Sequence, residues 1–193
     1  MQVTNIYQTL EDRQNDGEVE KHGPFFCSEK EADGSQKKGI KEPWLGAGYY
    51  FWDTRISDAH WWGQNIYASK GYIICHTTYD QHSPLLYDLV SNVAQLDDFV
   101  KCAELIKRER RIRYVRFPVV LNYLKNKVKE FNFKAIRVWP HPETHKPSAI
   151  RFPDNKLFLE KADKIQVCFF DKTLLTNPYK IVYKDRFTAE QTI

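Results

Sequence analysis

The sequence predicts an α+β fold, with residues 1–193 forming one domain. Runs of β-branched and aromatic residues near both ends of the chain indicate strands. Apolar residues at three- and four-residue spacing in the middle indicate helices. Strands at both ends with helices between them favour α+β over a regular α/β alternation.

In the first half of the chain, strands are expected over residues 3–10, 47–52 and 71–79, and a helix is expected over residues 57–67. Residues 11–43 are polar and contain glycine, so they are predicted to form a long loop or a set of short elements. Loops of this length in compact domains are often functional lids. This loop is therefore expected to cover a cleft or to meet a partner.

In the second half, helices are expected over residues 86–90, 93–106 and 119–131. The last of these rests on the helical spacing of Val120, Leu121, Leu124, Val128 and Phe131. Strands are then expected over residues 135–139, 150–152, 157–160, 165–170 and 179–183.

The bulk composition restricts the class of protein. The net charge of +4 and the pI near 8.7 permit an anionic ligand or a nucleic acid without requiring one. The four cysteines are far apart and form no CxxC pair, which favours reduced structural thiols and a cytoplasmic protein. The N-terminus does not resemble a signal peptide and no apolar run could span a bilayer, so no membrane partner is expected.

The densest group of aromatic residues lies in residues 44–63, WLGAGYYFWDTRISDAHWWG. Two glycines, Gly46 and Gly48, permit a close approach of the backbone. Tyr50 on the predicted strand and Trp61 on the predicted helix could enclose a flat heterocycle between their rings. The alternative is that both are core aromatics.

This segment resembles the GxGxYFA…SxSAxY block of the ADP-ribosyltransferase family, and most closely the branch that includes the poly(ADP-ribose) polymerases. The resemblance rests on Gly46, Tyr50, Ala59 and Trp61. It implies a split, mainly antiparallel sheet around an NAD cleft, with a helical insertion mid-chain. It also implies that Tyr50 packs beside the nicotinamide ribose and that Trp61 stacks on the nicotinamide. Asp58 stands where the family has the serine that binds the carboxamide.

The first strand of the family ends in His-Gly-Thr/Ser, and the matching positions here are Gln8 and Thr9. The resemblance therefore implies that Gln8 holds a ribose and that Thr9 holds the carboxamide. A literal His-Gly pair occurs at His22, but it follows a charged stretch that makes a poor strand. His22 is thus the alternative, and its other reading is an exposed loop histidine.

The last motif of the family is a strand of the form ExxxxD, and residues 166–171 match it with Gln166 at the glutamate position. The reaction that the resemblance implies cleaves the N-glycosidic bond between nicotinamide and ribose. It passes through an oxocarbenium-like transition state, which a nearby carboxylate stabilises. A neutral amide can only orient the ribose. Gln166 therefore indicates either a weakened site or a site in which another group, such as Glu160 or Asp163, supplies the carboxylate.

The resemblance implies transfer of ADP-ribose from NAD to a macromolecular acceptor, protein or nucleic acid such as RNA, with release of nicotinamide. One modification per site is expected, with Tyr50 and Gln166 as catalytic residues. A stand-alone transferase of this kind resembles bacterial toxins of toxin–antitoxin or phage-defence systems, which implies an antitoxin partner. A catalytically inactive NAD- or ADP-ribose-binding module is the alternative, and a protein-interaction domain with an aromatic core is the third interpretation.

Two further patterns carry weaker signals. The cationic run at residues 107–113, followed by Tyr114 and Arg116, could follow a phosphate backbone or could be a solvated helix end. His141, Glu143 and His145 alternate along a proline-rich segment, but no further ligand lies nearby in the sequence. No metal is expected.

Overall fold

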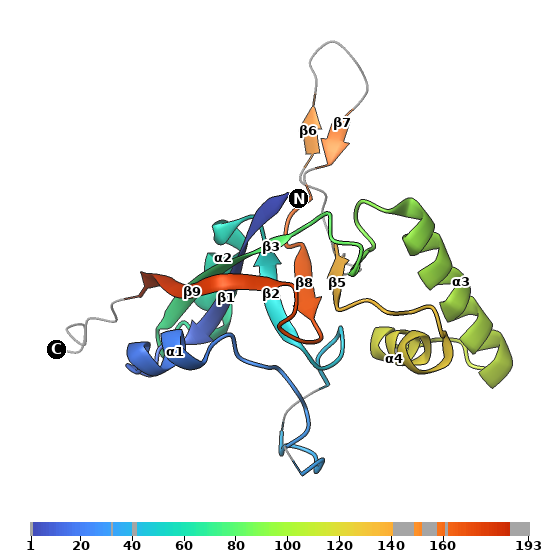
Figure 1. The fold of residues 1–193 in the computed structure, drawn as a ribbon, viewed down its shortest axis with the longest axis horizontal. Coiled ribbons are helices and arrows are strands. Elements are labelled where there is room, and N and C mark those ends of the chain that lie inside the picture. Colours follow the sequence, from blue (N-terminus) through green and yellow to red (C-terminus); the bar gives the residue numbers. More distant parts are fainter. Residues whose placement is uncertain are drawn as a thin grey trace.

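The computed structural model describes residues 2–31, 33–39, 42–140, 149–151, 158–160 and 162–185. Within these residues the chain forms a seven-stranded sheet, a two-stranded hairpin and four helices. Figure 1 shows α3 and α4 together at one side of the sheet, α1 and α2 at the other, and the β6–β7 hairpin projecting away from both. The predicted α+β class is confirmed.

The elements alternate irregularly along the chain, and their bounds are as follows: β1 Val3–Glu11, α1 Asp16–His22, β2 Tyr49–Asp53, α2 Ile56–Ile66, β3 Tyr72–Asp80, β4 Leu86–Asp88, α3 Val93–Arg110, α4 Phe117–Lys127, β5 Ala135–Val138, β6 Ala149–Arg151, β7 Phe158–Glu160, β8 Gln166–Phe169 and β9 Leu175–Lys184.

The main sheet has the strand order β4-β5-β8-β2-β1-β3-β9, and its pairs are antiparallel except for β4 with β5. β1 pairs with β3 along its whole length, over nine positions. In contrast, β1 and β2 pair only at Ile6 with Asp53 and at Tyr7 with Trp52. The two strands therefore separate after Tyr7, and the sheet opens between them.

Alternation along the strands distributes the core over both faces of the sheet. In β2, Tyr50 packs against the cluster built with α3 and α4, and Trp52 belongs to the cluster that α2 covers. Phe51 lies between them in sequence and points to the opposite face, where it is fully buried near Val19 of α1. Both faces are thus covered by helices, which the aromatic composition of β2 requires.

One predicted helix is wrong. Residues 86–90 were expected to be helical, but Leu86–Asp88 is the strand β4, paired in parallel with Ala135–Arg137. The apolar run is too short to make a helix, and Pro84 precedes it. The helix begins instead at Val93, because the Asn92 side chain accepts a hydrogen bond of 3.1 Å from the Gln95 backbone N–H.

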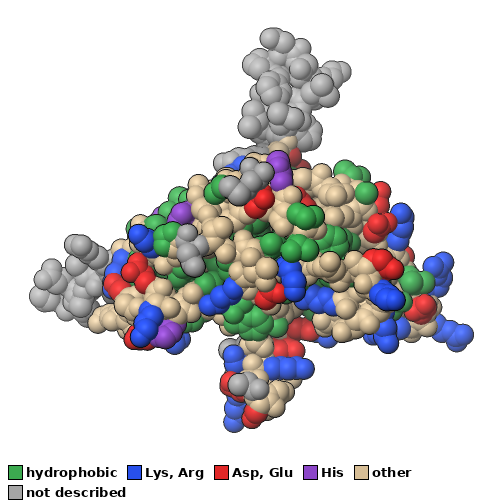
Figure 2. All heavy atoms as spheres, viewed as in Figure 1, with side chains coloured by type: hydrophobic (Ala, Val, Ile, Leu, Met, Phe, Trp, Pro, Cys, Tyr) green, Lys and Arg blue, Asp and Glu red, His purple; other side chains and the backbone are tan. Residues whose placement is uncertain are grey.

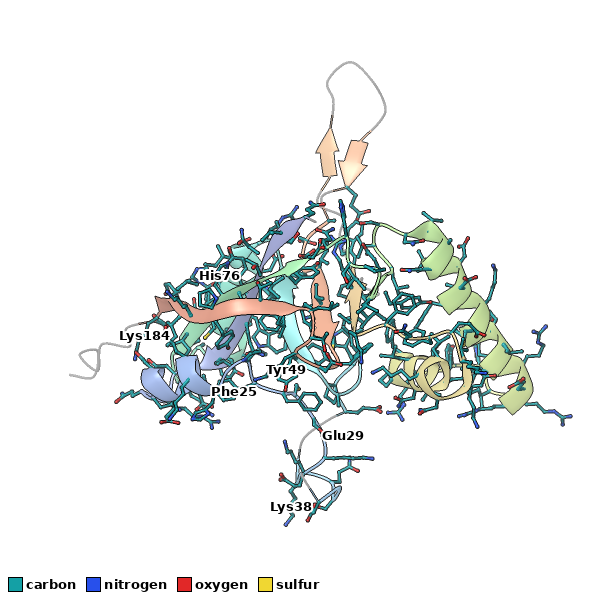
Figure 3. The ribbon with its side chains drawn as sticks, viewed as in Figure 1. Phe25, Glu29, Lys38, Tyr49, His76 and Lys184 are labelled. Carbon is teal, nitrogen blue, oxygen red and sulfur yellow. The ribbon has the colours of Figure 1, made fainter. Side chains whose placement is uncertain are left out.

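Residues 11–43, between β1 and β2, were expected to form either a long loop or a set of short elements. The segment contains short elements. It forms α1 and then an isolated bridge from Cys27 to Gly48. A second bridge joins Lys30 and Gln36 within a loop that projects from the molecule, with Lys38 near its far end in Figure 3. Among the described residues, no helix is both long and apolar enough to cross a membrane.

Candidate functional site

A cavity of about 450 Å³ lies where β1 and β2 separate. Its size falls within the range of small-molecule sites, about 300–1,000 Å³. Its aromatic lining comes from both strands, from α2 and from the segments that flank α1 and β2: Phe25, Phe26, Trp44, Tyr50, Phe51, Trp52, Trp62 and Tyr67. Its polar lining side chains are Gln8, Thr9, Cys27 and Gln166, and no lining side chain within the described part of the chain carries a formal charge.

Gln8 bridges the opening between the two strands. Its side-chain Nε2 donates to the carbonyl oxygens of Phe25, at 3.0 Å, and Tyr50, at 3.3 Å. Its Oε1 accepts from the Phe25 backbone N–H at 3.0 Å and from the Tyr179 hydroxyl at 2.7 Å. The Gln8 amide therefore forms hydrogen bonds with both the N–H and the C=O of residue 25, as the backbone of a neighbouring strand would.

This arrangement uses the full hydrogen-bonding capacity of the Gln8 amide, which has two N–H donors and one oxygen with two lone pairs. The side chain is also nearly buried. Gln8 cannot hold a ribose without giving up one of these bonds, so the structure gives it a positioning role. Thr9 is engaged in the same way, since its hydroxyl donates to the Ala59 carbonyl of α2 at 2.9 Å.

The Tyr50 hydroxyl is engaged within the loop that precedes β2. It donates to the Gly46 carbonyl at 2.7 Å and accepts from the Leu45 N–H at 2.9 Å. Burial raises the pKa of Tyr50 well above its usual range. The hydroxyl remains protonated, and the ring rather than the hydroxyl is what Tyr50 offers to the cavity.

The sequence indicated Trp61 as the ring that faces the ligand, but of the two tryptophans of α2 it is Trp62 that lines the cavity. Trp61 does not line the cavity; it is 40% exposed, and the Lys164 ammonium lies 4.0 Å from its ring centroid. Trp62 is the indole that lines the cavity, with its ring centroid 5.8 Å from that of Trp52. Because consecutive helical residues point about 100° apart, only one of the two can face the opening.

Asp58 also lies outside the cavity lining. Its carboxylate accepts a hydrogen bond of 2.8 Å from the Lys164 backbone N–H, at the turn that leads into β8. Burial raises the pKa of Asp58 despite this bond and despite the nearby Arg55. The carboxylate thus connects α2 to the turn before β8. The resemblance had implied that Asp58 contacts the ligand instead.

Gln166 lies in the cavity wall at the start of β8. Its Oε1 accepts a hydrogen bond of 2.7 Å from the Trp44 indole N–H, which fixes the orientation of the amide. Its Nε2 has no hydrogen-bond partner within the described part of the chain. Among the polar side chains of the cavity, Gln166 therefore retains a donor that a ligand can use.

The glycines of the aromatic block allow close packing within the protein. A Cβ at Gly48 would lie 2.7 Å from the Phe169 carbonyl oxygen and closer still to the Cys168 sulfur. Gly48 also pairs with Cys27 through two backbone hydrogen bonds, of 2.8 and 3.0 Å. Residues 25–27 are thereby held across the opening between β1 and β2. Gly46 has φ +81° at the turn that the Tyr50 hydroxyl closes.

The carboxylates proposed from the sequence lie elsewhere. Neither Glu160, which ends β7, nor Asp163, which lies near Asp58, lines the cavity. A second hollow of about 590 Å³ shares Trp44 with the cavity, and it is lined by Glu29 and Glu42. Figure 3 shows Glu29 below Phe25 and Tyr49, where the projecting loop begins.

His22 ends α1 on the surface, where its Nε2 lies 3.0 Å from the Glu18 carboxylate. It is not among the residues that line the cavity. This fits the exposed-histidine alternative. His141, Glu143 and His145 lie outside the described residues, and no group of potential metal ligands occurs among those that are described.

The four cysteines carry free thiols. Burial raises the pKa of Cys75 to about 11 and that of Cys168 to about 12. Cys27 is the exposed thiol, and it lines the cavity. Partial burial raises its pKa as well, although Lys37 opposes that shift.

Sequence reasoning missed three residues that shape the cavity: Phe25, Trp44 and Trp62. Phe25 lies in the polar segment assigned as a loop, and its place depends on Gln8 and not on any local pattern. Trp44 and Trp62 belong to the aromatic block that the sequence singled out. The sequence therefore located the block but did not show which of its residues line the cavity.

Comparisons with known proteins add no family. No protein-family model matches the chain, and neither a curated protein nor a solved structure shows significant similarity to it.

Proposed function

We propose that the cavity between β1 and β2 binds the nicotinamide end of NAD. The observation that carries this proposal is the lining itself, in which the described residues supply aromatic side chains, no charged side chain and one amide donor at Gln166. The nicotinamide ring of NAD is flat and cationic, and aromatic faces attract such a ring through their quadrupole. Its carboxamide needs hydrogen-bond partners, and the Gln166 Nε2 is placed to supply one.

The neighbouring tryptophans of α2 give a matched test. NAD binding is measured by calorimetry for the wild type, Trp62→Ala and Trp61→Ala. Loss of a stacking ring costs about 1–3 kcal/mol, so Trp62→Ala is expected to weaken binding about fivefold or more. Trp61→Ala should change the affinity less than about twofold, because Trp61 does not line the cavity. Equal losses in both variants, or no saturable binding by the wild type, would refute the proposal.

Cys27 offers a second readout that does not depend on turnover. Its thiol lines the cavity, whereas the other three cysteines are buried. Alkylation of the native protein at pH 8 is therefore expected at Cys27, and saturating NAD should slow it. Cys27→Ser should remove the labelling. Labelling that NAD leaves unchanged would place the ligand elsewhere.

ADP-ribose transfer to a macromolecular acceptor is the second candidate function. The motif resemblance and the place of Gln166 in the cavity wall support it. Among the described residues no carboxylate lines the cavity, so the residue that stabilises the oxocarbenium-like centre would come from the adjacent hollow. Glu29 is the better candidate there, because Glu42 is paired with Arg116.

Release of nicotinamide from NAD separates this activity from binding alone. If Gln166 orients the ribose, Gln166→Ala should lower the rate of release, and Gln166→Glu should raise hydrolysis by supplying a carboxylate. Glu29→Gln should abolish release if Glu29 acts, while Glu31→Gln serves as an exposed control on the same loop. Saturable binding with no release in any form would identify a binding module. A toxin role predicts growth arrest on expression that the inactive variants relieve.

A further inference from the structure

The turn that joins α3 to α4 is strongly cationic. We call residues 108–116 the basic turn; it contains the arginines at positions 108, 110, 111, 113 and 116 and a single acid, Glu109. Residues 108–114 are exposed without interruption. Figure 2 shows Lys and Arg side chains protruding at the lower right, over the end of α3.

Most of this charge is not neutralised by the protein. Arg116 pairs with Glu42, and Lys107 on the last turn of α3 pairs with Glu104. Within the described residues, no carboxylate forms an ion pair with the arginines at 108, 110, 111 or 113. Cations near a helix C-terminus interact favourably with the helix dipole, but that effect is confined to the last turn. Arg113 lies past the end of α3, so the dipole does not account for it.

An aromatic side chain accompanies the arginines. Tyr114 is 74% exposed, and the Arg113 guanidinium lies 5.1 Å from its ring centroid. A tyrosine this exposed gains little from burial, and most of its surface is open to a ligand. Exposed aromatic rings beside cations are what proteins use to stack unpaired bases while following the phosphate backbone.

The basic turn leads towards the cavity. Arg116 lines the hollow of about 590 Å³, which is also lined by Trp44. Trp44 in turn lines the cavity and donates to Gln166. A chain bound along the turn would therefore reach the rim of the cavity at Trp44.

We propose that the basic turn binds single-stranded nucleic acid, RNA or DNA. The arginines contact successive phosphates, for which the guanidinium fork is suited, and Tyr114 stacks on a base. An acidic protein segment would neutralise the arginines but would not explain the exposed ring of Tyr114. The inference concerns a surface outside the cavity, and it does not depend on whether NAD binds there.

The test uses fluorescence anisotropy with labelled 20-nucleotide single strands of mixed sequence, one RNA and one DNA, titrated with the full chain between 50 and 300 mM salt. The triple variant R108Q/R110Q/R113Q removes three cations from the turn. The control K21Q/K70Q/K180Q removes the same charge from exposed lysines on other parts of the surface. Because the net charges of the two variants are equal, a difference between them reports the location of the binding surface.

We expect the wild type to bind at least one of the two strands. The arginine variant should lose about tenfold or more in affinity at about 100 mM salt, and the slope of log K against log salt should flatten by about two, at roughly 0.7 per lost phosphate contact. The lysine control should lose less than about threefold. Tyr114→Ala should weaken binding about fivefold or more, with Tyr114→Trp retaining it.

Equal losses in the two triple variants would overturn the proposal, because binding would then depend on net charge alone. Failure of the wild type to bind either strand would also overturn it. So would polyglutamate of equal charge binding as tightly as the oligonucleotides, with Tyr114→Ala unchanged, since that result identifies an acidic protein partner.

Discussion

Gln8 shows how one side chain can complete a sheet that the backbone leaves open. β1 and β2 stop pairing after Tyr7, and the Gln8 amide then forms hydrogen bonds with the backbone N–H and C=O of residue 25. The hydroxyl of Tyr179 supplies its remaining hydrogen bond. The cavity exists because the strands part, and it keeps its shape because Gln8 spans the opening.

Replacement of Gln8 should therefore act on stability first. Gln8→Ala leaves the Phe25 N–H without a partner and removes the oxygen to which the Tyr179 hydroxyl donates, and we expect it to lower the free energy of unfolding by about 2–4 kcal/mol. Urea denaturation measures this change, with the exposed Gln36→Ala as the control. A loss below about 0.5 kcal/mol would show that the four hydrogen bonds do not stabilise the fold.

Asp58 should give stability a specific pH dependence. Because burial raises its pKa in the folded protein, ionisation of Asp58 opposes folding, and this penalty grows as the pH rises through the folded pKa. Asp58→Asn keeps an oxygen that can accept from the Lys164 N–H while removing the charge. The variant should be more stable than the wild type at pH 7–8, and the difference should shrink as the pH falls towards about 4.

Urea titrations at several pH values measure this difference, with Asp98→Asn at an exposed position as the control. An Asn variant that is less stable at pH 8, or a difference independent of pH, would contradict the assignment.

At the scale of elements, helix ends and helix rotation decide the geometry. α2 presents Trp62 to the cavity and Trp61 to Lys164. The C-cap of α3 is Arg111, a non-glycine residue in the left-handed region with φ 53° and ψ 40°. That conformation is unfavourable for residues with a Cβ, and it directs the chain into the basic turn.

The end of α3 allows a prediction with opposite signs at adjacent residues. Arg111→Gly relieves the left-handed strain and should raise the free energy of unfolding by about 0.5–1 kcal/mol. Arg110→Gly removes the same charge from the last helical residue and should lower it by about 1 kcal/mol. Thermal or urea unfolding of the Arg111→Gly and Arg110→Gly variants measures both changes in the free energy of unfolding. Destabilisation by both variants would show that Arg111 itself contributes contacts.

At the scale of the whole molecule, the cavity and the neighbouring hollow meet at Trp44. The described lining of the aromatic cavity contains no charged side chain, whereas the hollow beside it is lined by Glu29, Glu42 and Arg116. A ligand that binds only the folded cavity must stabilise the entire fold by mass action.

For NAD, this linkage gives a quantitative expectation. At a free concentration 100 times its dissociation constant, NAD should raise the free energy of unfolding by about 2.7 kcal/mol. Trp62→Ala should reduce the increase at the same NAD concentration, and Trp61→Ala should not. A melting temperature that NAD leaves unchanged up to millimolar concentrations would argue against the cavity as its site.

The sequence by itself determined the class of fold, because strand and helix periods are local properties of residues such as Val120 and Leu124. It also identified the aromatic block, since seven large rings beside two glycines are visible without any contact. It missed β4, whose three residues become a strand only through pairing with β5.

The tertiary structure decided which side chains of the block serve the cavity. The rotation of α2 is set by packing against β1 and β3, so the sequence could not distinguish Trp61 from Trp62. The partners of Gln8 lie 17, 42 and 171 residues away, and no local pattern records them. The sequence indicated Gln8 as a ligand-binding residue. Its hydrogen bonds to distant segments show that it spans the opening between β1 and β2.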